Sequence, residues 1–188
     1  MIMLKVYRKD LKDDNNKLYP VYDLSFYDKL NLVGGNSGSG KSYFANVLED
    51  ALNNTQPWTY ECFNVLNPDE KVKVIVVKSL NEIDTLLTNN KDCVIVIDED
   101  TTINLRKMNG LALVKKSQNY FILMDRQLEI KMDINVKAIF KFSEYGYKRH
   151  KTYKLENYFN IREVDIKNAD ISRITHVITE DSTSGKLF

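Results

Sequence analysis

The fold expected of this chain is decided by one stretch, Gly35-Asn36-Ser37-Gly38-Ser39-Gly40-Lys41-Ser42. It matches the pattern G-x-x-x-x-G-K-[ST] at every fixed position and holds three of the 7 glycines of the chain. An apolar segment, Leu30–Val33, precedes it and an amphipathic segment, Tyr43–Leu52, follows it, which predicts a strand, a loop and a helix. Glycines gathered at one place indicate a special backbone conformation rather than a linker.

A loop of this kind is suited to hold phosphate groups. Glycines let backbone N–H groups converge on an anion, and the first turn of the following helix adds its own unsatisfied donors. We expect Lys41 to reach the β- and γ-phosphates of a nucleotide and Ser42 to offer its hydroxyl to Mg²⁺. The predicted nucleotide contacts are Gly35, Asn36, Ser37, Gly38, Ser39, Gly40, Lys41, Ser42 and Tyr43.

Two acids follow a second apolar strand. Val94–Ile97 has four consecutive aliphatic residues and runs into Asp98 and Glu99, which places both acids at the carboxyl edge of a buried strand. Asp98 suits a hold on Mg²⁺, and Glu99 suits a general base that orients water against the γ-phosphate. The alternative is a helix N-cap or a solvated turn, which an acid after a strand often forms.

The rest of the chain alternates between β-rich and helical segments, which predicts a parallel sheet covered on both faces. A polar run from Asp10 to Lys17 separates two short N-terminal strands, and a hairpin turning at Gly146 follows the last parallel strand. We expect one domain over residues 1–188, with a core at about 29–142 and a basic hairpin and tail at about 143–188. The remaining strand candidates are Val72–Val77, Tyr120–Met124 and Val136–Phe142, and the helix candidates are Leu80–Leu87 and about Thr101–Lys116.

Together the two motifs resemble those of P-loop NTPases, with residues 35–42 as the Walker A motif and residues 94–99 as the Walker B motif. Glu99, directly after Asp98, resembles the catalytic glutamate of the P-loop class whose sheet has an additional strand. The resemblance implies a three-layer α/β fold, in which a mainly parallel central sheet of order 5-1-4-3-2 has helices on both faces. The N-terminal strands and the C-terminal β-hairpin are additions to that fold.

The resemblance also implies the chemistry. ATP and Mg²⁺ are the expected cofactors, Ser42 and Asp98 the metal ligands, and Lys41 and Glu99 catalytic residues. A polar residue ending the fourth strand often senses the γ-phosphate in this family, which points to Asp125 and, as a second candidate, Arg126. A surface pairing with a neighbour such as Glu129 is the alternative for Arg126.

Other likenesses are narrower. The N-terminal strands are similar to the entry of ABC and SMC-like ATPase heads, but no L-S-G-G-type signature lies between Ser42 and Asp98. The compact core and basic hairpin resemble small ATPases of phage and mobile-element type. A GTPase needs N-K-x-D, whereas Asn90-Lys91-Asp92-Cys93 has the acid one position early, so adenine is favoured by exclusion.

The composition sets limits on partners and location. The net charge is +1, so nucleic acid or anionic membrane would need a local patch. The hairpin offers one through Lys148, Arg149 and Lys151, although an exposed hairpin whose lysines keep it soluble is the favoured interpretation. With 2 cysteines far apart, no signal peptide and no run of ~18 apolar residues, we expect a cytoplasmic protein without a membrane span.

We therefore expect a Mg²⁺-dependent ATPase that serves as the ATPase component of a larger assembly, acting with a protein partner or as a homo-oligomer. A small-molecule or nucleotide kinase is one alternative, in which Asp98 and Asp100 would hold a substrate hydroxyl. It is disfavoured because Gln127–Asn135 carries no arginine for a lid. The other alternative is a switch or scaffold that binds ATP without hydrolysing it.

Overall fold

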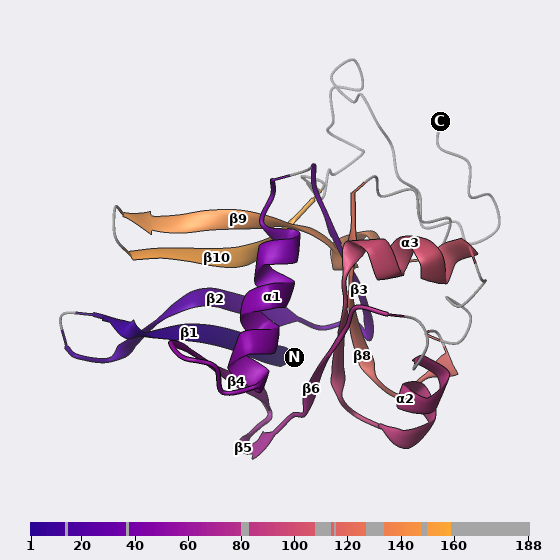
Figure 1. Cartoon of the computed structure of the whole chain (residues 1–188), viewed down its shortest axis with the longest axis horizontal. Helices are drawn as coiled ribbons and strands as arrows, with labels where there is room; N and C mark the ends of the chain where they lie inside the picture. Colours follow the sequence, from indigo (N-terminus) through magenta and orange to yellow (C-terminus); the bar gives the residue numbers. More distant parts are fainter. Residues whose placement is uncertain are drawn as a thin grey trace, which may run out of the picture.

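The computed structural model describes residues 1–13, 15–36, 38–79, 83–107, 114, 116–126, 134–147 and 150–158 (Figure 1). Within these residues a single sheet of ten strands is accompanied by three α-helices. The helices are α1 (Lys41–Leu52), α2 (Ile83–Asn89) and α3 (Glu99–Lys107). The strands are β1 (Ile2–Lys12), β2 (Leu18–Phe26), β3 (Leu30–Gly34), β4 (Trp58–Asn64), β5 (Asn67–Lys71), β6 (Val74–Val77), β7 (Val94–Ile97), β8 (Tyr120–Asp125), β9 (Ile139–Tyr147) and β10 (His150–Asn157).

The sheet is mixed, and its order is β5-β4-β1-β2-β10-β9-β3-β8-β7-β6. Neighbouring strands from β9 to β6 run parallel, whereas β5, β4, β1 and β2 are antiparallel neighbours. The antiparallel hairpin of β9 and β10 joins the two halves, because β9 pairs with β3 and β10 pairs in parallel with β2. The hairpin is thus an internal part of the sheet.

The sheet curls into a half-barrel, and a short link connects its two end strands. A flat sheet of ten strands would be roughly 43 Å wide, since neighbouring strands lie about 4.8 Å apart. Its two end strands, β5 and β6, are linked only by Val72 and Lys73, which can span at most about 11 Å. The backbone N–H of Val72 donates to the carbonyl of Cys62 in β4, and the carbonyl of Lys73 accepts from Val94 in β7. This link therefore holds together strands from both halves (Figure 1).

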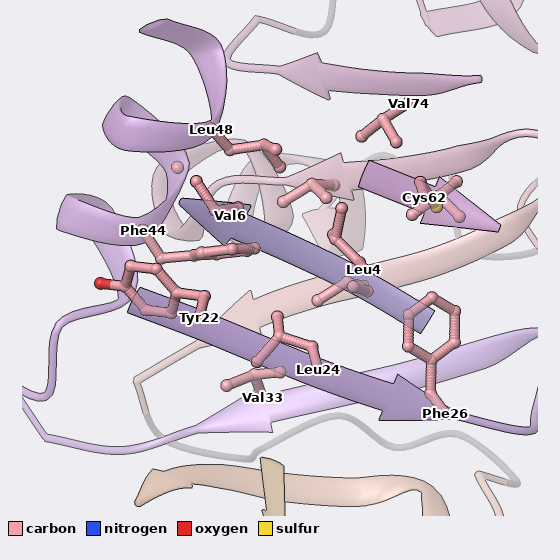
Figure 2. Packing of buried hydrophobic residues seen from close by; sticks show 14 of the residues in the cluster. Leu4, Val6, Tyr22, Leu24, Phe26, Val33, Phe44, Leu48, Cys62 and Val74 are labelled. Carbon is pink, nitrogen blue, oxygen red and sulfur yellow. The ribbon is translucent and has the colours of Figure 1, made fainter. Parts of the chain in front are cut away.

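Helix α1 packs into the larger of two buried clusters. Its buried positions Phe44, Ala45, Leu48 and Ala51 recur at helical spacing, so one stripe of α1 faces the sheet. Figure 2 shows Phe44 and Leu48 of α1 in one cluster with Val6 of β1 and with Tyr22 and Leu24 of β2. A fully buried phenylalanine contributes about 1.5–3 kcal/mol relative to an exposed one, so this stripe anchors the helix that follows the glycine loop.

Strand β7 contributes to both clusters, which explains why its sequence lacks polar alternation. Val94 and Val96 belong to the cluster around α1, while Ile95 and Ile97 belong to the second cluster with Ile83 of α2. All four β7 residues are fully buried. The carboxyl end of β7 is therefore fixed from both sides, and the acids that follow it start from a rigid strand.

The fold class expected from the resemblance was wrong. The protein is a strand-rich, ten-stranded mixed sheet curled into a half-barrel with few helices in its described residues, and it is not a three-layer fold with a mainly parallel central sheet (order 5-1-4-3-2) and helices on both faces. The two N-terminal strands are long, with 11 and 9 residues, and β4 and β5 extend them into an antiparallel half. The expectation rested on apolar runs, which indicate buried parallel strands. The half-exposed strands of the antiparallel half have no such runs.

Several elements differ from the expected bounds. Helix α3 begins at Glu99, two residues before the expected start, and residues 108–113 lie outside the described residues. The hairpin of β9 and β10 is confirmed, but Gly146 lies within β9 as the partner of Lys151, so the turn expected at Gly146 was wrong. No helix or strand was predicted over Asn67–Lys71, which forms strand β5. The tail at 159–188 lies outside the described residues.

Candidate functional site

The loop between β3 and α1 depends on its glycines. Gly35, Gly38 and Gly40 have φ angles of 144°, 85° and 86°, a backbone region that residues with a side chain rarely adopt. A Cβ on Gly35 would also lie 2.9 Å from Ser39 Oγ. The expected contact residue Ser37 lies outside the described residues. The glycine pattern thus has a local cause in the backbone of this loop.

Lys41, at the start of α1, folds back over the loop. Its side chain is 3% exposed, and its Nζ donates to the carbonyl of Gly35, to Ser39 Oγ at 3.0 Å and to the carbonyl of Asn36 at 3.4 Å. Nζ also lies 3.4 Å from Glu99 Oε2. A buried ammonium needs such partners, because its desolvation is costly. The loop therefore forms a small cradle with one positive charge at its centre.

The acids after β7 meet this charge. Glu99 is 6% exposed and is the first residue of α3, and its carboxylate faces the ammonium group of Lys41. The carbonyl of Asp98 accepts from the N–H of Thr102, as an N-cap carbonyl does, but within the described residues its buried Oδ1 has no hydrogen-bond partner. Asp98 thus stands at the N-cap position that the alternative expects, while its side-chain Oδ1 does not cap α3 and is left as an acceptor that suits a cation.

Strand β8 brings two further residues to the same edge. Asp125 is fully buried and pairs in register with Gly34, the last residue of β3 before the loop. Arg126 follows it and places Nε 2.6 Å from Glu99 Oε1, as an ion pair rather than an aligned hydrogen bond. The expected alternative partner, Glu129, lies outside the described residues. Arg126 was the second candidate for a γ-phosphate sensor, but its contact with Glu99 was not predicted from the sequence.

Lys41, Glu99 and Arg126 line a pocket of about 240 Å³. The pocket is bounded by the loop, the start of α1, the glutamate after β7 and the arginine after β8: Gly38, Ser39, Gly40, Lys41, Ser42, Tyr43, Glu99 and Arg126. The expected residues Gly35, Asn36, Asp98 and Asp125 are not among the lining residues. Pockets for whole small molecules usually measure about 300–1,000 Å³, so this one suits a phosphate chain with the nucleoside outside it.

Two larger cavities, of about 640 and 620 Å³, lie elsewhere, one along β4 and the other beside the loop before β7. They contain none of the expected site residues. Cys93 and Asn90 line the second of them, and the buried Asn119 accepts from the N–H of Cys93 and donates to the carbonyl of Asn90. This side chain positions the start of β7, a role that no motif in the sequence signals.

Magnesium ligation by Ser42 and Asp98 is compatible with the residues present. Mg²⁺ is bound by one or two protein oxygens together with phosphate oxygens and water. Ser42 lines the pocket, and Asp98 supplies the buried acceptor described above. In the described ranges, no three side chains of His, Cys, Asp or Glu gather into a group that could hold a metal ion alone. An ion here would need the phosphates as ligands.

The basic hairpin carries paired charge where it is described. Lys151 Nζ lies 2.7 Å from Glu144 Oε1, and this bond raises the pKa of Lys151 and lowers the pKa of Glu144. The ring of Tyr153 stacks on Tyr22, so it faces the core. Lys148 and Arg149 lie outside the described residues. These contacts favour the structural interpretation of the hairpin over a nucleic-acid surface.

Helices in the described ranges lack the length and apolarity that crossing a membrane requires. Both cysteines are buried and free, and burial raises the pKa of the Cys62 thiol to about 12 and also raises that of Cys93. Neither thiol is therefore suited to nucleophilic chemistry at neutral pH. No protein-family model matches this chain, and a search of curated proteins found no match.

Proposed function

We propose that this protein binds ATP at the loop between β3 and α1 and hydrolyses it with Mg²⁺. One observation carries the proposal: Lys41, Glu99 and Arg126, which come from three separate elements, meet at the glycine loop and line one pocket. Two cations, a buried carboxylate and a glycine-built cradle are the groups that phosphoryl transfer requires. The proposal concerns this site and does not depend on the fold class that was expected.

The residues divide the work by their chemistry. The loop N–H groups and Lys41 would hold the β- and γ-phosphates, and Ser42 and Asp98 would hold Mg²⁺, whose bound charge offsets that of the phosphates. Glu99 would orient a water molecule and accept its proton. Asp125, which is the last residue of β8 and is buried beside Gly34, would sense whether the γ-phosphate is present.

The pocket leaves the nucleoside outside, so the choice of ATP rests on the missing guanine-reading motif. We further propose that hydrolysis serves a larger assembly, through a protein partner or a second copy of the chain. Nucleic acid remains a minor candidate partner, since Lys151 is paired with Glu144.

Phosphate release from ATP and Mg²⁺ by the purified protein tests the proposal, with and without mixed DNA and RNA. Lys41→Ala should abolish ATP binding and release, whereas Glu99→Gln should abolish release and retain binding. Lys78→Ala is a matched control, because Lys78 is a lysine paired with Glu49 outside the pocket.

The outcomes separate the alternatives. Release by the wild type that is lost in both variants and kept in the control supports an ATPase. Tight ATP binding without release supports a switch, or a kinase that awaits its acceptor. Absence of ATP binding by the wild type contradicts all three interpretations.

A further inference from the structure

The Glu99 carboxylate lies between two cations. Lys41 Nζ is 3.4 Å from Oε2, and Arg126 Nε is 2.6 Å from Oε1. The carboxylate side chain is 8% exposed and that of Lys41 3%, so water screens their contact little. Each carboxylate oxygen therefore faces a different positive group.

This arrangement conflicts with the role of a base. A carboxylate that orients water needs a free oxygen on the side of the phosphate, and here both oxygens are engaged by cations. Lysine and arginine are also the two side chains that bind phosphate most readily. The carboxylate of Glu99 thus binds the two cations, Lys41 and Arg126, that a terminal phosphate would bind.

The two cations differ in freedom. The Arg126 side chain is 56% exposed, so it can change partner without unpacking the core. It directly follows Asp125, the register partner of Gly34, and therefore lies where β3 enters the loop. Among the described contacts of its guanidinium, Nε reaches Glu99, and the side chain lines the pocket.

We propose that Arg126 is a catalytic residue that contacts the terminal phosphate, and that Glu99 holds it in place until nucleotide binds. This inference rests on the proposed function. On nucleotide binding, Arg126 leaves Glu99 for the γ-phosphate, and Oε1 is released to accept a hydrogen bond from water. The site thereby carries its own arginine and needs none from a partner.

The hydrolytic step balances with these groups. The water oxygen forms a bond to the γ-phosphorus, and the bond from that phosphorus to the β–γ bridging oxygen breaks. The water proton passes to Glu99, and the bridging oxygen leaves with its electron pair on ADP. Arg126 offsets the negative charge of the transferring group, a contribution that reaches 10³–10⁵ in rate in some enzymes.

Affinity for ATP and ADP separates this role from a structural one. Arg126→Ala should lower turnover about 100-fold and reduce the preference for a non-hydrolysable ATP analogue over ADP about tenfold, because one charged contact to the γ-phosphate is lost. Affinity for ADP should not change. Arg126→Lys should restore part of the preference. Arg8→Ala is the matched control, since Arg8 is an exposed arginine paired with Asp10 outside the pocket.

A double variant provides the decisive comparison. If Arg126 merely holds Glu99, then Arg126→Ala has no effect on the ATP-to-ADP affinity ratio once Glu99 is already Gln. The proposal predicts the same tenfold loss in the Glu99→Gln background, and it predicts that Glu99→Gln alone binds ATP more tightly than the wild type. An unchanged ratio in that background overturns the proposal.

The two proposals fail differently. If the wild type does not bind ATP, or if Lys41→Ala binds it equally well, the proposed function is wrong. If the wild type binds ATP through Lys41 while Arg126→Ala keeps both its turnover and its ATP preference, the proposed function stands and the role of Arg126 is overturned.

Discussion

Tyr22 and Tyr153 pair in register between β2 and β10, and their rings stack with centroids 5.2 Å apart at an angle of 25°. This pair joins the antiparallel half of the sheet to the hairpin that leads into the parallel half. Tyr22 is 1% exposed and its ring also contacts Phe44 of α1 and Phe142 of β9. The contact therefore connects the glycine-loop helix with both halves.

Tyr22→Ala should consequently lower the free energy of unfolding by about 3–5 kcal/mol, the usual cost of removing a large buried ring. Urea unfolding followed by circular dichroism measures it. Tyr145→Ala, which removes a ring that is 46% exposed, should cost less than about 1 kcal/mol. Equal losses in the two variants would contradict the assigned role of the pair.

Gly35 and Gly38 offer a comparison within the loop. Both have positive φ angles, but a Cβ on Gly35 meets Ser39 at 2.9 Å, whereas a Cβ on Gly38 meets nothing within 4 Å. Gly38→Ala should cause only backbone strain of about 1–2 kcal/mol. Gly35→Ala should cause backbone strain and also a clash with the side chain of Ser39. We expect ATP affinity to fall about tenfold further in Gly35→Ala, measured by calorimetric titration. The reverse order would mean that the loop adopts another shape when it binds.

Asp98→Asn tests the metal site. The buried Oδ1 of Asp98 lacks a hydrogen-bond partner among the described residues, so the charge contributes little to the fold and is available to a cation. We expect the Mg²⁺ concentration for half-maximal phosphate release to rise at least tenfold, with no loss in the temperature of unfolding. Asp100→Asn, a change to the exposed acid beside it, is the control and should alter neither value. A variant with the Mg²⁺ dependence of the wild type would exclude Asp98 as a ligand.

Buried thiols and phenols predict alkaline destabilisation. Burial raises the pKa of Cys62 from 9.0 to about 12, so between these values the unfolded chain loses a proton that the folded protein keeps. The unfolded state is then favoured, and stability should fall as pH rises from 9 towards 12, by up to ~1.4 kcal/mol per pH unit for one group. Tyr7 and Tyr22, with their pKa values raised mainly by burial, add to this above pH 10.

Cys62→Ala should reduce the slope between pH 9 and 10, as measured by urea unfolding in the presence of a reductant. The comparison at pH 7, where the thiol is protonated in both states, isolates the packing lost with the side chain. A slope equal to that of the wild type would show that Cys62 is not the group that titrates.

Much of the parallel half could be predicted from local pattern. Val94–Ile97 is a short aliphatic run without polar alternation, and such a run is stable only when both faces are buried. Strand β5 could not be predicted in this way, because all five of its residues are exposed. It is a strand because it pairs with the preceding strand β4, where Phe63 and Lys71 are partners, and five exposed residues show no periodic pattern that would indicate this pairing.

The glycine loop is what the sequence by itself determined. Its positive φ angles and its place between a strand and a helix follow from residues 30–52 alone, because backbone conformation is a local property. The tertiary structure alone decided the curl of the sheet and the contact of Arg126 with Glu99. These residues lie 27 positions apart on neighbouring strand ends. Arg126 can pair with Glu99 only because the register of β7 and β8 brings the ends of these two strands close together.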